Sequence, residues 1–291
     1  MAELKKYKSP QQLVALMQSR GLMITNAASA EEILRTTNYY RLSGYLHDFK
    51  DLSSGLYANG LTWEKLLRIY DFDRRFTRIL MFALEDIEET LKTRISLTLT
   101  SAYTDDPEIY LRPYVYREYA PYMKFLSFFE KEVDNNKKLP FVRHHIEQYR
   151  GHFPMWVAVE LFTMGNLHAL YDNFTGRYQK ALASLYGTGP RQLSSWIENL
   201  TYTRNHLAHY MRIYNFNFGR TPLKCKRHPK YIGTSNMIFD QIYVIACMYS
   251  DPAEWNNYIL SGMEQLLAEF EPDISLSGLG FPQNWQTILH R

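Results

Sequence analysis

The sequence TWEKLLRIYDFDRRFTRILMFALEDIEETLKTRISLTLTSA, residues 62–102, is the stretch that decides the fold. Its apolar residues recur every three or four positions, which is the spacing of one face of an α-helix in a bundle. Thr62 can cap the first turn, and Asp105-Asp106-Pro107 interrupts the pattern. The apolar stripe consists of Leu66, Ile69, Tyr70, Phe76, Leu80, Ala83, Leu84, Ile87, Leu91 and Ile95. One long helix is predicted from Thr62 to about Ala102.

Helix signals dominate the rest of the chain, and strand signals are scarce. Ser9-Pro10-Gln11-Gln12 combines a capping serine, a proline at the first helical position and a glutamine at the capping-box position. A second capping box, from Ser29 to Glu32, predicts a helix over residues 30–37, and the aromatic segment 38–45 that follows is turn-prone. Further helices are expected over residues 118–135, 154–170, 191–214, 234–249 and 252–270. The predicted fold class is therefore all-α.

The predicted helices group into an N-terminal helical segment (1–60), a helical bundle (61–270) and a loose C-terminal tail (271–291). The composition, 46% apolar and 22% charged residues, is ordinary for a globular protein, and the net charge of +3 permits an acidic partner without requiring one. Cys225 and Cys247 are too few for a disulfide framework or a cysteine-rich zinc site. No window is long and apolar enough to span a membrane, and the N-terminus lacks the apolar core of a secretory signal. We expect a cytoplasmic protein.

A second stretch, Tyr202-Thr203-Arg204-Asn205-His206-Leu207-Ala208-His209-Tyr210, carries the residues that suggest chemistry. Arginine offers a permanent, forked cation for phosphate oxygens, and histidine takes or gives a proton near neutral pH. Held together, these two groups can cut RNA without a metal. The spacing alone is a weak signal, because an arginine followed by a histidine at four to six positions should arise by chance about twice in this chain. A second match, Arg41 to His47, has nothing else to suggest a site.

The motif residues fall on different faces of a helix. If residues 191–214 are helical, each residue turns by about 100°, so Asn205 and His209 stand one above the other on a polar stripe. Arg204 then points about 140° away from His209, at the edge of the apolar face. Three arrangements remain open: the helix bends, the arginine stem wraps around it, or Arg204 is buried against an acid. A buried arginine needs a partner, and the candidates on the long helix are Glu85 and Glu88.

Other residues around the motif have a functional and a structural interpretation. For His206 the structural interpretation is favoured. A metal site formed by His206 and His209 is not expected, because neither histidine has a cysteine or a carboxylate next to it. Tyr202 and Tyr210 can stack a base, although packing is the commoner use of tyrosine. The basic run after the motif either follows RNA phosphates or is simply solvated. The residues expected to bind RNA are His206, Arg212, Arg220, Lys224, Lys226, Arg227 and Lys230, and no metal or cofactor is expected.

Several short motifs together resemble a known family. Arg-Asn-x-x-x-His at residues 204–209 of an all-α chain resembles the HEPN superfamily of ribonucleases. The order of motifs along the chain resembles the Abi family of bacterial abortive-infection proteins, in its AbiD/AbiF-like group. These motifs are Arg20-Gly21-Leu22, Asn38-Tyr39-Tyr40-Arg41-Leu42-Ser43-Gly44-Tyr45, Ile69-Tyr70-Asp71-Phe72-Asp73-Arg74, Pro154-Met155-Trp156, Thr163-Met164-Gly165-Asn166-Leu167 and Arg204-Asn205-His206-Leu207-Ala208-His209. The chain departs from the family after His209, where a further Arg or an Asn-Arg pair is common and this sequence reads Arg212-Ile213-Tyr214-Asn215.

The resemblance implies a HEPN helical core, RNA cleavage without a metal and a role in defence against bacteriophage. HEPN sites commonly form where two domains face each other, so a single motif implies a symmetric homodimer. The catalytic residues that the resemblance implies are His209 as general acid or base and Arg204 as the phosphate-binding cation. Asn205 is implied to orient His209 or the phosphate. Attack by the RNA 2′-hydroxyl leaves 2′,3′-cyclic phosphate and 5′-hydroxyl ends. The alternative is an RNA-binding module that holds a structured or regulatory RNA and is inactive or restrained as a nuclease.

Overall fold

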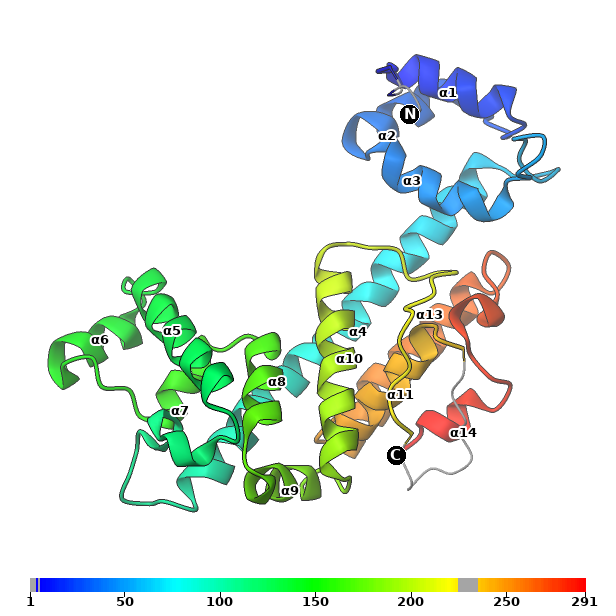
Figure 1. The fold of residues 1–291 in the computed structure, drawn as a ribbon. Coiled ribbons are helices and arrows are strands. Elements are labelled where there is room, and N and C mark those ends of the chain that lie inside the picture. The colour runs from blue at the N-terminus through cyan, green and yellow to red at the C-terminus, as the bar shows by residue number, and fades with distance from the viewer. Residues whose placement is uncertain (1–3, 5, 225–234) are drawn as a thin grey trace.

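One long helix runs through the molecule (Figure 1). The computed structural model describes residues 4, 6–224 and 235–291. Helix α4 spans Trp63–Thr100, and the Thr62 hydroxyl caps it by accepting a hydrogen bond from the Lys65 amide at 3.1 Å. The expected apolar stripe from Leu66 to Ile95 is buried, apart from the half-buried Tyr70. The long helix predicted from the sequence is confirmed.

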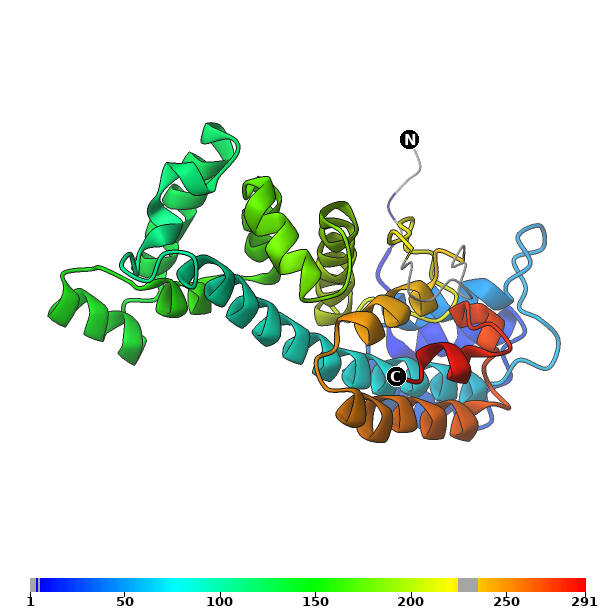
Figure 2. The same ribbon diagram turned by 90° about the horizontal axis from the view of Figure 1, so that it is seen from below.

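Shorter helices pack against α4 and bury its apolar stripe. Figure 2 shows α8 (Met164–Asn173), α9 (Gly176–Ser184) and α10 (Pro190–Ala208) on one side of α4 and α13 (Ser261–Phe270) on the other. Helices α5 (Tyr119–Asn135), α6 (Pro140–Tyr149) and α7 (Met155–Ala158) gather around the C-terminal end of α4 (Figure 1). Within the described ranges the β-structure is limited to isolated bridges. The all-α fold class is confirmed.

The N-terminal segment begins with two helices whose caps differ in how well the sequence predicts them. Helix α1 (Pro10–Ser19) has the expected capping box between Ser9 and Gln12. Helix α2 (Ala27–Thr36) begins earlier than expected, because the Asn26 side chain caps it by accepting from the Ser29 amide at 2.9 Å. The capping box predicted at Ser29 is therefore wrong: that serine lies inside the first turn.

The turn predicted over residues 38–45 is also wrong. The Asn38 side chain accepts from the Tyr40 amide and starts a helix, α3 (Tyr39–Leu46), which continues into a 3-10 turn, His47–Phe49. An asparagine in this role suits a helix start as well as a turn, so the local sequence leaves the two open. Contact with α4 buries Leu42 and Tyr45 and favours the helix.

The apolar helix expected from Pro154 through Leu170 is broken in two. Helix α7 passes into a 3-10 turn, Val159–Leu161, and the backbone is extended at Phe162 before α8 begins. Thr163 and Asn166 form a capping box at the start of α8. Such a box gives the chain a new helix start, so α8 takes a direction of its own. Two further 3-10 turns, Ile109–Leu111 and Pro113–Val115, precede α5.

The C-terminal part packs onto the bundle. α11 (Ile238–Met248) is followed by α12 (Pro252–Glu254), a π-helical stretch, Trp255–Leu260, and α13, which confirms the helix predicted over residues 252–270. The expectation of a loose tail is wrong, because a 3-10 turn, Leu276–Leu279, and α14 (Trp285–Leu289) return to the core. The buried tail residues are Leu279, Phe281, Trp285, Ile288 and Leu289. None of the helices in the described part combines the length and hydropathy needed to span a lipid bilayer.

Asp73 is a buried carboxylate at which three segments meet. It projects from α4 and is only 2% exposed. Its Oδ2 accepts hydrogen bonds from the Tyr45 hydroxyl of α3 at 2.6 Å and from the Ile213 amide at 2.8 Å. Its Oδ1 accepts from the Tyr214 amide at 2.9 Å. Asp73 thereby joins the N-terminal segment, the long helix and the chain that follows the arginine–histidine motif.

Burial is the main influence on the ionisation of Asp73. It raises the pKa of Asp73 to about 6, and the three hydrogen bonds and the charge of Arg212 only partly oppose it. Because the pKa is higher in the folded than in the unfolded chain, the folded protein binds more protons between these two pKa values. The stabilising effect of this group is therefore complete below about pH 4 and is lost as the pH rises through about 6.

We expect Asp73→Asn to lower the free energy of unfolding by about 1–3 kcal/mol near pH 7, because an amide cannot accept all three hydrogen bonds. The deficit should be larger in acid and shrink by about 1.4 kcal/mol per pH unit between roughly pH 4 and 6. Urea denaturation of both proteins across this range measures the difference, and the comparison cancels the other carboxyl groups. A deficit that grows with pH contradicts the prediction.

Candidate functional site: the C-terminal end of helix α10

Helix α10 carries the arginine–histidine motif and has one buried and one exposed face. Pro190 occupies its first turn, as the sequence predicts. The apolar face is buried against α4, α8, α9 and α11, so only the opposite strip is open to a ligand. The C-terminal end of α10 points toward the N-terminal segment (Figure 1). The buried residues of the apolar face include Leu193, Ile197, Leu200 and Leu207.

Helix α10 ends at Ala208, earlier than the predicted end at residue 214. The Tyr210 amide donates to the Leu207 carbonyl at 2.9 Å, and the Met211 amide donates to the His206 carbonyl at 3.1 Å. This pair of bonds is a Schellman motif, whose turning residue, here Tyr210, has a left-handed backbone with φ of 57°. Glycine is the usual signal for such an end, and the sequence has none here, so the helix is predicted too long.

Asn205 and His209 occupy the exposed strip at this helix end. The His209 amide donates to the Asn205 carbonyl at 3.0 Å, so the two residues lie on successive turns of the same face. Both are exposed. Their side chains make no hydrogen bond or ion pair with the described residues, which leaves an amide and an imidazole free for a ligand.

Arg204 faces α4, away from this pair. Its Nε lies 3.5 Å from the Glu88 Oε2, and the side chains of Arg204 and Glu88 are 39% and 16% exposed. Of the three arrangements that the sequence leaves open, the structure has the pairing with an acid, and the acid is Glu88, while Glu85 is exposed. No hydrogen bond joins the side chains of Arg204 and His209 within the described residues. The guanidinium is half-exposed, so its terminal nitrogens can still reach a bound anion.

His206 has a structural role. It is 7% exposed, and its Nε2 donates to the Arg212 carbonyl at 2.7 Å, which fixes the turn after α10. Its ring centroid lies 4.4 Å from that of Phe216 and 5.1 Å from that of Phe218. Burial lowers the pKa of His206, so its imidazole is neutral at physiological pH. This placement agrees with the structural interpretation favoured by the sequence, and RNA binding by His206 stays a prediction.

Arg212 holds the N-terminal segment. Its Nη1 donates to the Gly44 carbonyl at 2.6 Å and to the Asp48 Oδ2 at 2.7 Å, and its Nη2 donates to the Asn215 carbonyl at 3.3 Å. Arg212 lies beyond the end of α10, so it is not part of the exposed strip of Asn205 and His209. Its donors are already engaged, and RNA binding by this residue stays a prediction.

The basic run after the motif is only partly described. The Arg220 Nη1 lies 2.7 Å from the Glu198 Oε1, and its guanidinium lies 5.4 Å from the centroid of the Tyr202 ring. Lys224 is exposed. The other residues predicted to follow phosphates lie outside the described residues, and they are Lys226, Arg227 and Lys230.

Arg41 contacts the end of the motif, and the sequence analysis did not predict this contact. Its Nη1 donates to the Tyr210 carbonyl at 2.5 Å, and its guanidinium lies 5.8 Å from the centroid of the Tyr210 ring. Arg41 belongs to the aromatic segment 38–45, which therefore braces the end of the motif from α3. Its position within a family-like segment was a signal, but nothing local connected that segment with residue 210.

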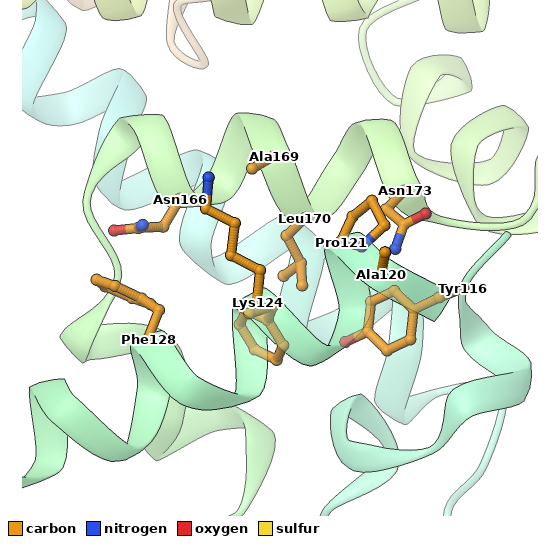
Figure 3. A pocket seen from close by; sticks show the side chains of 10 residues that line it. Tyr116, Ala120, Pro121, Lys124, Phe128, Asn166, Ala169, Leu170 and Asn173 are labelled. Carbon is orange, nitrogen blue, oxygen red and sulfur yellow. The ribbon is translucent and has the colours of Figure 1, made fainter. Parts of the chain in front are cut away.

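A cavity of about 490 Å³ lies between α5 and α8, away from the motif (Figure 3). Its lining is largely apolar, with Lys124 at its edge. The two asparagines that line it already serve the fold: Asn166 caps α8, and Asn173 exchanges hydrogen bonds with the backbone of Glu118 at 3.0 and 2.9 Å. No residue of α10 lines this cavity.

Comparison with known proteins identifies the family. The model of the Abi-like protein family matches residues 32–215, which is more than half of the chain. The match begins in α2 and includes the three segments that meet at Asp73 and all of α10. No curated protein and no solved structure matches the chain. The family suggests a part in abortive infection, a bacterial defence against bacteriophage. On the strength of this match, the chain belongs to the family of Abi-like proteins.

Proposed function

We propose that this protein is a metal-independent endoribonuclease of the HEPN type that acts in abortive infection. The observation that carries the proposal is the free imidazole of His209 beside the free amide of Asn205, on a strip that the rest of the bundle leaves open. The same helix, α10, also carries Arg204, whose guanidinium forms an ion pair with Glu88. A proton-transfer group and a fixed cation are the minimum that RNA cleavage without a metal requires.

The chemistry divides into three tasks. A base removes the proton of the ribose 2′-hydroxyl, whose oxygen attacks the adjacent phosphorus. Arg204 stabilises the negative charge that grows on the phosphoryl oxygens, and Asn205 orients the phosphate or the imidazole. An acid protonates the departing 5′-oxygen as its bond to phosphorus breaks. The products are a 2′,3′-cyclic phosphate and a 5′-hydroxyl.

Two proton transfers favour two protomers. The motif contains two histidines, but His206 is buried and bonded to a backbone carbonyl, so His209 is the one histidine that the described part of a protomer offers at this strip. A second copy of the chain, related by a two-fold axis, would supply the other imidazole. It would also bring its own Arg204 opposite the first His209. The two residues could then act together, although within one chain they lie on different sides of the helix. We therefore propose a homodimer with a shared site.

A restrained nuclease that mainly binds RNA is the second candidate. It is favoured by the state of the arginines: Arg204, Arg212 and Arg220 are each paired with a carboxylate. Such pairs lower the positive potential that an approaching RNA meets, although surface pairs are weak and exchange with phosphate at little cost. Co-purified nucleic acid, seen as a high ratio of absorbance at 260 to that at 280 nm, would point to this candidate.

We expect wild-type protein in EDTA to cut total bacterial RNA and leave cyclic phosphate ends, and His209→Ala to lose at least about 100-fold in rate. The control is His47→Ala, which removes the exposed histidine of the other arginine–histidine spacing and should cut normally. Mapping both ends of the products measures the outcome. Cleavage that needs added metal, or that leaves 5′-phosphates, excludes the proposed chemistry.

Removing Glu88 tests whether it positions Arg204. We expect Glu88→Ala to lower kcat/KM by about 10- to 100-fold, because the guanidinium loses the ion pair that orients it. Glu85→Ala is the matched control, since Glu85 lies one turn away on the same helix, is exposed and contacts no described cation. Equal activity of the two variants would remove Glu88 from the site.

A shared site makes activity depend on protein concentration. We expect the specific activity to fall on dilution, in step with the loss of dimer seen by sedimentation. Mixing the wild type with an excess of inactive His209→Ala should lower the specific activity of the wild type, because a mixed dimer carries only one of the two imidazoles. Constant specific activity across a dilution series in which the protein is monomeric argues for a site within one chain.

A further inference from the structure

Tyr210 adopts a backbone conformation that is poorly suited to an aromatic residue. Its φ is 57°, in the left-handed region, at the position of the Schellman motif where glycine is the usual residue. A side chain there crowds the backbone, and an aromatic residue has no polar group with which to compensate locally, as asparagine has. Strain of this kind concentrates at functional sites. The ring of Tyr210 is therefore a candidate for a role beyond the fold.

The position of the ring shows what that role is. Tyr210 is 73% exposed, so its ring contributes little to the core. Arg41 holds it from the N-terminal segment, with its Nη1 2.5 Å from the Tyr210 carbonyl and its guanidinium 5.8 Å from the ring centroid. The cation fixes the residue and supplies a positive charge at its edge, while the rest of the ring remains open. Tyr202 packs near Phe218 and is 37% exposed, so it offers a smaller open surface than Tyr210 does.

Tyr210 directly follows the proposed catalytic histidine in the chain. The Cα atoms of His209 and Tyr210 are about 3.8 Å apart, as in any pair of neighbours, and both side chains are exposed. A flat, open aromatic ring beside a positive charge suits a nucleic acid base followed by its phosphate. A base can meet such a ring only when it is unpaired and unstacked, because pairing and stacking in a duplex cover its faces.

We infer that Tyr210, held by Arg41, stacks on an unpaired RNA base next to the scissile phosphate and so directs the site to single-stranded RNA. The inference rests on the proposed function and deepens it, since it names the form of RNA that the site accepts. The step is non-covalent: the base leaves its own stack and lies on the ring. Its ribose and phosphate are thereby brought to His209.

The test separates binding from cleavage. The probe is a short 2′-O-methyl RNA, which has no free 2′-hydroxyl to attack and carries one 2-aminopurine whose fluorescence falls on stacking. We expect Tyr210→Ala to weaken binding of the single strand by about 5- to 100-fold and to abolish the fluorescence change. Tyr210→Trp should keep both. Binding of the same sequence as a duplex should be weaker and unaffected by either substitution.

Two further variants guard against a loss of structure. Tyr210→Gly relieves the left-handed conformation, so its melting temperature should equal or exceed that of the wild type while single-strand binding falls as for alanine. Tyr258→Ala removes a tyrosine of matched exposure, 72%, from the segment Trp255–Leu260 and should bind normally. Equal binding by Tyr210→Gly and wild type, equal losses on single strand and duplex, or no binding of the single strand by the wild type each overturns the inference.

The outcome is independent of the nuclease assay. If wild type binds the single strand through Tyr210 but cuts no RNA, the base platform stands and the proposed cleavage fails. If wild type cuts RNA with cyclic phosphate ends and Tyr210→Ala cuts with an unchanged KM and unchanged preference for single strands, cleavage stands and the platform fails.

Discussion

The fold depends on one carboxylate that is buried in a largely apolar core. Asp73 sits inside the bundle and accepts three hydrogen bonds, one from the Tyr45 hydroxyl and two from backbone amides of residues 213 and 214. Burying an ionisable group is unfavourable, and its pKa of about 6 reflects that cost. The bonds are directional, so this group sets where the N-terminal segment and the chain after α10 lie relative to α4.

The region around Asp73 is also the support of the candidate site. Residues 209–214 leave the helix in an irregular path, and such a path holds its shape only when its polar groups are satisfied. Asp73 holds residues 213 and 214, His206 holds the carbonyl of residue 212, and Arg41 holds that of residue 210. Arg212 adds hydrogen bonds from this path to the Gly44 carbonyl of α3 and to the Asp48 carboxylate. The end of the motif is thus fixed by groups from the N-terminal segment, from α4 and from α10 itself.

This bracing gives the residues of one short motif different tasks. His206, which points inward, is neutral, buried and structural, while His209, three positions later, is exposed and free. Arg204 is oriented by an acid on another helix, and Tyr210 is turned outward by a left-handed backbone. Our proposals follow from this division: proton transfer at His209, charge stabilisation by Arg204 and base stacking on Tyr210.

Periodic apolar spacing by itself determined the long helix 63–100, most of the other helices and the all-α class, because a buried helical face must repeat every three or four residues. The helical geometry also left the pairing of Arg204 with an acid of the long helix as one of three open arrangements, with two candidate acids. The tertiary structure alone decided the rest. The end of α10 at Ala208, the helix at residues 39–46 and the packed tail all depend on contacts between residues far apart in the chain, such as Arg41 with Tyr210 and Trp255 with Leu289. Local propensity does not encode such contacts, because their free energy is gained only once the bundle has formed.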